Sequence, residues 1–228
     1  MSTLHRIRIP SVCAVLTALS LPVASLAQEP STLLEAAMFD DLAAVKAFVE
    51  AGADINETND YHQTPLLLAC NYGYEETAEY LISQGADVNV PDQDGGTALI
   101  AAASSSSRLV VLLLAEGADI GAKMANGTGV MTRFTIGIIR ERVPLELGEI
   151  LLSHGADVDE ALAGGRTNGY TPLMMAARNN QEPLVEFLIE HGADVRATAE
   201  DGATPLSLAE DEGHENIVEI LKAKGGGR

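Results

Sequence analysis

The residues of this chain that could carry out chemistry include four histidines beyond the first thirty positions, His62, His154, His191 and His214. His154 and His191 each precede a Gly-Ala-Asp sequence, which puts them at equivalent places in neighbouring structural units. Packed helices lie roughly 8–10 Å apart, so these two imidazoles would be too distant to share a zinc ion easily. No cysteine or histidine cluster has zinc-ligand spacing. We therefore predict no metal or cofactor site, and interpret both side chains as cations near helix C-termini.

Other stretches with reactive side chains also lack the patterns that catalysis requires. Ser104–Ser107 has no G-x-S-x-G sequence around it, and we interpret it as a solvated turn between helices. Gly164-Gly165 lacks the phosphate-loop sequence, and Glu210-Asp211-Glu212 lacks EF-hand spacing. Cys70 is the single cysteine beyond residue 27 and is expected to be a small buried side chain. We predict that the protein is not an enzyme; a catalytic site within residues 130–143 is the alternative.

The elements that would position these residues recur along the chain. Asn59–Asn89 contains Thr-Pro-Leu, the small pair Ala69-Cys70 and an apolar segment that ends in Gly-Ala-Asp. The corresponding glycines lie 33, 32, 38, 37 and 33 residues apart, at Gly52, Gly85, Gly117, Gly155, Gly192 and Gly225. The corresponding threonines are Thr64, Thr97, Thr128, Thr171 and Thr204. Threonine caps the start of a helix, and glycine adopts the left-handed conformation that ends one. The pattern therefore predicts repeated pairs of helices.

This pattern resembles the ankyrin repeat, in which Thr-Pro-Leu opens the first helix and Gly-Ala-Asp follows the second. The resemblance implies an all-α solenoid of about six helix-turn-helix repeats with β-hairpin loops, stacked on one continuous core. Within a domain of residues 28–228, the repeats are expected at 32–57, 59–89, 92–121, 123–159, 166–196 and 199–225. Second helices are expected at Leu42–Glu50, Glu76–Ser83, Arg108–Ala115, Leu145–Ser153, Pro183–Glu190 and Glu215–Lys222.

Repeat four departs from the pattern. Its threonine and glycine, Thr128 and Gly155, are 27 residues apart instead of the usual 21, and four more residues are extra before Thr171. We expect Val130–Val143 to form a longer first helix or a helix plus loop, and residues 161–165 to lengthen a hairpin. Residues 108–178 hold seven basic and eight acidic residues, whereas the rest of the chain is strongly acidic. Two interpretations stay open: a docking protrusion, or a drifted repeat that still packs.

The 228-residue chain has a formal net charge of −19, which disfavours a polyanionic partner such as nucleic acid. Its first 27 residues have the features of a secretory signal: Arg6 and Arg8, the apolar run Val12–Leu21 and a small-x-small site ending at Ala27. We predict cleavage after Ala27, a periplasmic or secreted location, and no stable membrane insertion after the signal is removed. An uncleaved anchor is the alternative.

The ankyrin resemblance implies that hairpin tips and first helices line a concave face that contacts a protein partner. Exposed tyrosines are favoured anchors at such contacts, and acidic residues near both ends would attract a basic partner. The predicted contact residues are Asp60, Tyr61, Gln63, Asn71, Tyr72, Gln93, Asp94, Ser104, Ser105, Arg133, Arg140, Arg142, Thr167, Asn168, Tyr170, Arg178, Asn179, Glu200, Asp201, Asp211 and Glu212.

The chain is also similar to small exported ankyrin proteins of bacteria. We predict a monomeric, non-enzymatic interaction module that presents its concave groove to a protein partner in the periplasm. One alternative is an immunity protein that neutralises a secreted antibacterial toxin, such as a phospholipase or a nuclease. Another is an accessory factor to a periplasmic oxidative-stress enzyme such as catalase. The N-terminal signal disfavours an effector that is injected directly into a host.

Overall fold

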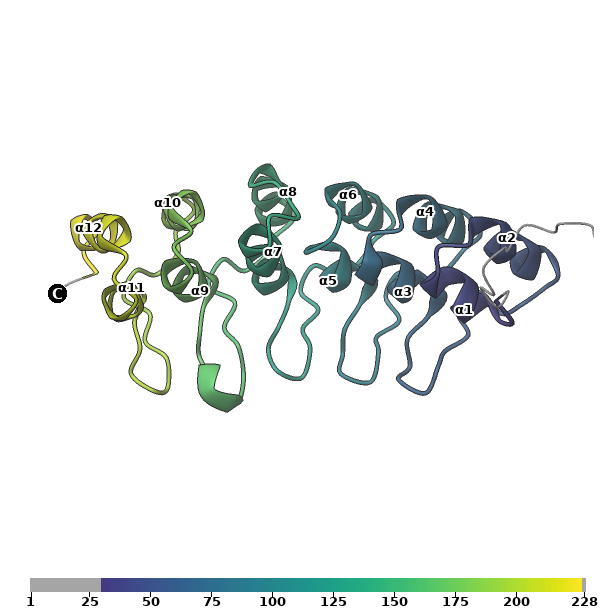
Figure 1. The fold of residues 1–228 in the computed structure, drawn as a ribbon, viewed down its shortest axis with the longest axis horizontal. Helices are drawn as coiled ribbons and strands as arrows, with labels where there is room; N and C mark the ends of the chain where they lie inside the picture. The colour runs from purple at the N-terminus through teal and green to yellow at the C-terminus, as the bar shows by residue number, and fades with distance from the viewer. Residues whose placement is uncertain (1–29, 227–228) are drawn as a thin grey trace, which may run out of the picture.

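The computed structural model describes residues 30–226, which form twelve α-helices arranged in six consecutive pairs (Figure 1). The first helices of the pairs are α1 (Leu33–Met38), α3 (Pro65–Tyr72), α5 (Ala98–Ala102), α7 (Val130–Ile139), α9 (Pro172–Arg178) and α11 (Pro205–Asp211). The second helices are α2 (Leu42–Glu50), α4 (Glu75–Ser83), α6 (Ser107–Ala115), α8 (Glu146–Ser153), α10 (Glu182–Glu190) and α12 (Glu215–Ala223). No strand occurs between residues 30 and 226, so the expected all-α solenoid is confirmed. The proposed signal, residues 1–27, lies outside the described residues.

Each helix pair begins and ends at the residue types that the sequence pattern indicated. The first helices α3, α5, α9 and α11 start after threonines whose hydroxyls accept a hydrogen bond from the backbone N–H three residues later. All six closing glycines have φ between 81° and 94°, a conformation in which other residues would be strained. The second helices lie within one residue of their expected positions.

One continuous core runs through the stack, because every repeat packs against its neighbours. Each first helix contacts the first helices on either side of it, from α1 to α11. Small side chains permit this close approach: Ala36, Ala69, Ala102 and Ala176 are all fully buried. Cys70 occupies the same kind of position and is also fully buried, as predicted, and burial raises its pKa to about 12.

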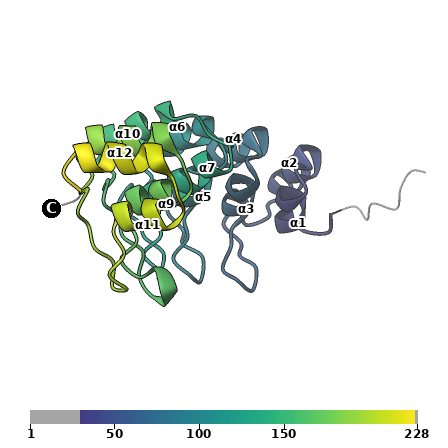
Figure 2. The ribbon, with the colours of Figure 1, turned by 60° about the vertical axis from the view of Figure 1, so that its left-hand side comes forward.

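The hairpin loops project from the same side of the array, next to the row of first helices (Figures 1 and 2). A chain of backbone hydrogen bonds joins each loop to the next. The N–H group of Gln93 donates to the carbonyl of Tyr61 (3.0 Å), and the N–H group of Ala125 donates to the carbonyl of Asp94 (2.8 Å). The same bond links Ala163 to Asn126 (2.6 Å) and Glu200 to Asn168 (3.1 Å). The loop tips therefore form one connected edge along the molecule.

Repeat four begins differently from the prediction. Thr128 is not the cap of α7; the capping position belongs to Gly129, which has no side chain to accept a hydrogen bond. The Glu160 carboxylate replaces the missing hydroxyl: its Oε1 accepts from the N–H groups of Gly129 (2.8 Å) and Thr132 (2.9 Å). Glu160 is only 2% exposed, and a Cβ on residue 129 would overlap its carboxylate. Gly129 and Glu160 therefore form one structural unit.

The extra residues of repeat four are divided between a helix and the turn that follows it. Helix α7 has ten residues against eight in α3, and a turn through Arg140–Val143 connects it to α8. The lengthened helix is packed, because Gly137 lies against the Val143 side chain and the Ser104 backbone. The last hairpin but one holds the second insertion, whose tip forms the short 3₁₀ turn η1 (Gly165–Thr167), as expected. No helix in residues 30–226 is long and apolar enough to cross a bilayer.

Candidate partner-binding face

The hairpin tips and the C-terminal ends of the first helices carry most of the predicted contact residues, and most of these are exposed. Tyr61 on a hairpin tip is 60% exposed, and Tyr72 at the end of α3 is 58% exposed. The other exposed members of the predicted set are Asp60, Gln93, Asp94, Arg140, Arg142, Arg178, Asn179, Glu200, Asp201, Asp211 and Glu212. The half-buried members are Gln63, Asn71, Ser105, Arg133, Thr167 and Asn168. The structure therefore leaves a large polar surface open to solvent on these elements.

Two predicted contact residues are buried, and for them the prediction is wrong. Tyr170 is only 6% exposed: its ring packs with Met174 and Ala199 between the last two hairpins, and its hydroxyl donates to Asp201 (3.2 Å). Ser104 is 5% exposed, and its hydroxyl donates to the carbonyl of Ala101 (3.4 Å).

The serine run as a whole is structural and not a solvated turn. Ser105 donates to the Cys70 carbonyl in the preceding repeat (2.7 Å). Ser106 is buried, caps α6 and donates to Glu75 (2.5 Å). These hydroxyls replace the wider turn of the other repeats with one that is bonded to its neighbour. They are consequently unable to serve a partner.

The histidines occupy the helix ends that the sequence indicated. His154 and His191 are the C-caps of α8 and α10, and each Nδ1 contacts a carbonyl of its own helix, at 2.8 and 2.7 Å. The hydrogen bond to the Phe187 carbonyl raises the pKa of His191. His214 precedes α12, and its Nε2 contacts the Arg178 carbonyl (3.0 Å). No group of three His, Cys, Asp or Glu side chains in the described part of the chain could hold a metal ion.

The basic residues of the central segment fall into two classes. Arg108, Lys123 and Arg178 form ion pairs with acidic side chains of adjacent repeats, the shortest being the 2.6 Å contact between Arg108 and Glu79. Arg133, Arg140, Arg142 and Arg166 make no ion pair among residues 30–226. Exposed ion pairs contribute little stability, but they do neutralise a charge. The unpaired arginines are therefore the cations that this segment offers to a ligand.

A cavity of about 110 Å³ lies on this face, where α3, α5 and α7 meet two hairpin loops. Its lining includes Leu67, Asn71, Ile100, Asp92 and Arg133. The Nε atom of Arg133 is buried and has no hydrogen-bond acceptor among the described residues. Burial lowers the pKa of this guanidinium, and the positive charges of Arg140 and Arg142 lower it further.

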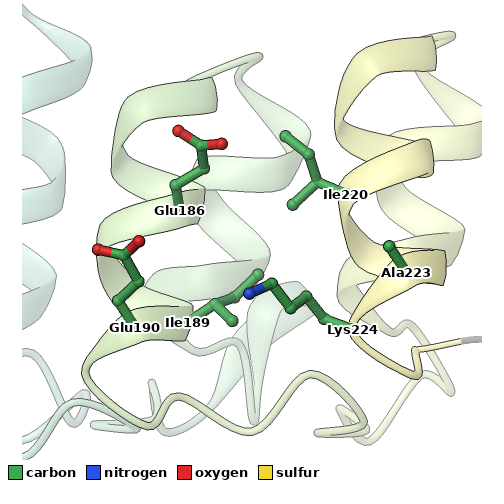
Figure 3. Close-up of a pocket in the computed structure, with 6 residues that line it drawn as sticks. All are labelled: Glu186, Ile189, Glu190, Ile220, Ala223 and Lys224. Carbon is green, nitrogen blue, oxygen red and sulfur yellow. The ribbon is translucent and has the colours of Figure 1, made fainter.

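A second cavity of about 170 Å³ lies in the other row of helices, between α10 and α12 (Figure 3). Glu186 and Glu190 line it from α10, and Lys224 extends toward them from the end of α12. Ile189 and Ile220 form its apolar part. Because both helices belong to the row farther from the hairpin loops, this cavity is separate from the partner-binding face.

Sequence reasoning did not identify two residues that the structure makes prominent. Phe39 follows α1 and is 64% exposed, at the end of a first helix like Tyr72. Its position after a repeated helix could have revealed it. Glu160 was one of 33 acidic residues with no motif around it. The signal was at Gly129: counted from Gly117, this residue restores the 12-residue spacing of the other caps but lacks the hydroxyl.

The comparisons with known proteins agree with this architecture. A sequence model described as ankyrin repeats (3 copies) matches residues 33–124 and 140–227. The chain belongs to the ankyrin repeat family. The unmatched residues 125–139 contain the altered cap and most of α7, which are the departures described above.

Among related proteins, the putative ankyrin repeat protein YahD of Escherichia coli is 31% identical over 207 residues, covering 86% of this chain and 96% of YahD. The NF-kappa-B p105 subunit of chicken is 34% identical over 174 residues, or 75% of this chain. That match spans only 17% of p105. The human ASB11 ankyrin repeat domain has a similar solved structure, with a TM-score of 0.70 and 27% identity; the match covers 86% of this chain and 84% of that domain.

Proposed function

We propose that this protein is a non-enzymatic binding module that holds a protein partner against the hairpin tips and first helices. Ankyrin repeats are protein–protein interaction modules. The observation that carries the proposal is the exposure of aromatic side chains, Phe39, Tyr61 and Tyr72, on these two sets of elements. Large exposed aromatic groups are costly in a surface with no ligand and are favoured as anchors in interfaces.

The charges of this face favour a partner with a basic surface. Asp60 and Asp94 are exposed on two hairpin tips, and Glu200 and Asp201 are exposed on the last one. None of these four carboxylates has a basic partner among the described residues. Complementary charges accelerate association and fix the orientation of the complex more than they add affinity. An immunity protein bound to a basic toxin would use such a face, which makes that role our second candidate.

We further propose that the protein acts in the periplasm or outside the cell, as a monomer, after cleavage behind Ala27. The support is the basic, apolar and small-residue order of the first 27 residues. Mass spectrometry of the protein from a periplasmic fraction is expected to give an N-terminus at Gln28. A chain recovered intact from the membrane fraction would instead show that the segment is an anchor.

Charge reversal tests the binding face. The partner would be isolated by affinity capture from a periplasmic extract of the source organism, with residues 28–228 as bait. Asp60→Lys combined with Asp94→Lys is expected to weaken partner binding at least tenfold, mainly through slower association at low salt. The matched control reverses Glu76 and Glu219, which are exposed on α4 and α12 in the other row of helices. Equal affinities for both double variants and the unaltered chain would disprove the proposed face.

A further inference from the structure

The cavity beside Arg133 has the chemistry of a site for one anionic group. Arg133 lies in the first turns of α7, and its side chain is half buried beside α3 and α5. Its buried Nε has no acceptor, and the guanidinium makes no ion pair in residues 30–226. A buried polar group without a partner costs about 1–3 kcal/mol, more when it is charged. Such a group calls for an explanation in terms of function or strain.

The shape and lining of the cavity restrict what could pair with this guanidinium. Its volume of about 110 Å³ exceeds the roughly 30 Å³ that one water occupies in the liquid, so a small side-chain group fits. Leu67, Ile100 and Ala101 provide apolar walls for a methylene stem. The half-buried Asn71 amide, which makes no hydrogen bond within residues 30–226, is a second donor beside Arg133.

A guanidinium presents two parallel N–H groups that match the two oxygens of a carboxylate. The one carboxylate already in the cavity, that of Asp92, is committed to its own loop. Its Oδ1 accepts from the N–H groups of Gly96 (2.7 Å) and Asp94 (3.0 Å). Asp92 therefore supports the hairpin and makes no ion pair with Arg133, although its charge acts against a second anion nearby.

We propose that this cavity is a carboxylate-binding pocket that takes a glutamate or aspartate side chain from the protein partner. The inference rests on the proposed function and adds to it a specific feature of the partner: a surface that is basic where it meets the acidic hairpin tips, with one acidic side chain that enters between α3, α5 and α7. Arg140 and Arg142, exposed at the far end of α7, add positive charge on the same helix.

The test uses a small probe, so it does not depend on knowing the partner. Residues 28–228, which contain every described contact, would be labelled with ¹⁵N and titrated with N-acetyl-glutamate N-methylamide. We expect saturable shifts of the Arg133 Nε–H signal and of the Ile100 and Ala101 amide signals, with a Kd in the millimolar range. The glutamine analogue, which has the same shape and no charge, is expected to leave these signals in place.

Variants identify the residues responsible. Arg133→Gln is expected to weaken probe binding at least fivefold, whereas Arg166→Gln, which alters an exposed and unpaired arginine on another loop, leaves it unchanged. Asp92→Asn keeps the oxygen that accepts from Gly96 and Asp94 but removes the charge, so it is expected to tighten binding at least twofold. This second variant keeps the test decisive even if Arg133→Gln does not fold.

Three results would overturn the pocket: no saturable shift up to 50 mM probe (roughly ten times a Kd in the millimolar range expected above), an equal response to the glutamine analogue, or an equal response to sodium sulfate at the same ionic strength. The first excludes binding, the second excludes recognition of charge, and the third shows a general anion site. Each of these would leave the charge-reversal result at the hairpin tips untouched. Conversely, unchanged partner binding after charge reversal would disprove the face while leaving the probe result standing.

Discussion

Replacing Glu160 by alanine is the sharpest test of how repeat four is held together. The carboxylate accepts two backbone hydrogen bonds at the start of α7, from Gly129 and Thr132, and all three residues are buried. Alanine would leave both N–H groups without an acceptor, at about 1–3 kcal/mol each. The favourable interaction of a negative charge with a helix N-terminus, about 0.3–2 kcal/mol, would also be lost.

Relief of the cost of burying a carboxylate offsets part of this loss. We therefore expect Glu160→Ala to lower the free energy of unfolding by about 4 kcal/mol at pH 7, since the two orphaned donors dominate. For a chain of this size that corresponds to a fall in Tm of roughly 10 °C. Glu160→Gln keeps one accepting oxygen and loses the charge, so about 1–2 kcal/mol is expected for that variant.

Urea unfolding of residues 28–228, followed by circular dichroism at 222 nm, measures these differences. Amide hydrogen exchange at Gly129 and Thr132 locates them, because these two N–H groups should lose protection before others. The matched control is Glu57→Ala. Glu57 occupies the equivalent loop position two residues after a Gly-Ala-Asp-Ile segment's aspartate, but it is only half buried and accepts one long hydrogen bond, from Leu34 (3.2 Å). A loss of about 1 kcal/mol is expected there.

The reasoning would be refuted if Glu160→Ala cost no more than Glu57→Ala. It would also fail if Glu160→Gln were more stable than the unaltered protein, because desolvation of the carboxylate would then outweigh its two hydrogen bonds. Gly129→Ala provides an independent check, since its added Cβ must displace the carboxylate. Combining Gly129→Ala with Glu160→Ala should cost little more than either change alone, because both remove the same contacts.

Three further predictions follow from the structure. Thr64→Ala should lower the free energy of unfolding by about 1 kcal/mol, because it removes a helix cap, whereas Thr128→Ala should cost clearly less in the same urea experiment. Gly148→Ala should lower the Tm by several degrees, because its Cβ would lie 2.5 Å from the Phe187 ring and overpacking costs about 1–3 kcal/mol. Native protein at pH 8 should resist alkylation of Cys70 by iodoacetamide, monitored by mass spectrometry, and react once unfolded, because burial raises the thiol pKa to about 12.

The regular part of the fold could be predicted because each of its determinants is local. Thr64 caps α3, Pro65 occupies the first helical position, and Gly85 ends the repeat in a left-handed conformation. All three act within a few residues of their own position, so sequence spacing is enough to reveal them. The helix α2 was placed at Leu42–Glu50 for the same reason.

The remainder depends on contacts between repeats, which sequence spacing does not reveal. Tyr170 has the composition of an exposed anchor, but the next hairpin covers it and Asp201 accepts its hydroxyl proton. Ser104 belongs to a turn that is shorter than in other repeats, which draws its hydroxyl into the stack. Glu160 is thirty-one residues from the N–H group of Gly129 that it satisfies. In each case the deciding neighbour lies in another part of the chain.

Repeat four shows that departures from a repeat pattern can depend on one another. Gly129 removes the usual cap, which leaves room and unsatisfied donors for the Glu160 carboxylate. That replacement allows α7 to begin with Val130 in register and to place Arg133 beside α3 and α5, where its charge has no pair. If the repeat had merely drifted, nothing would require an uncompensated guanidinium to stay beside the core, since a neutral side chain would be more stable there. An arginine at this position is therefore better explained by what it binds than by what it stabilises.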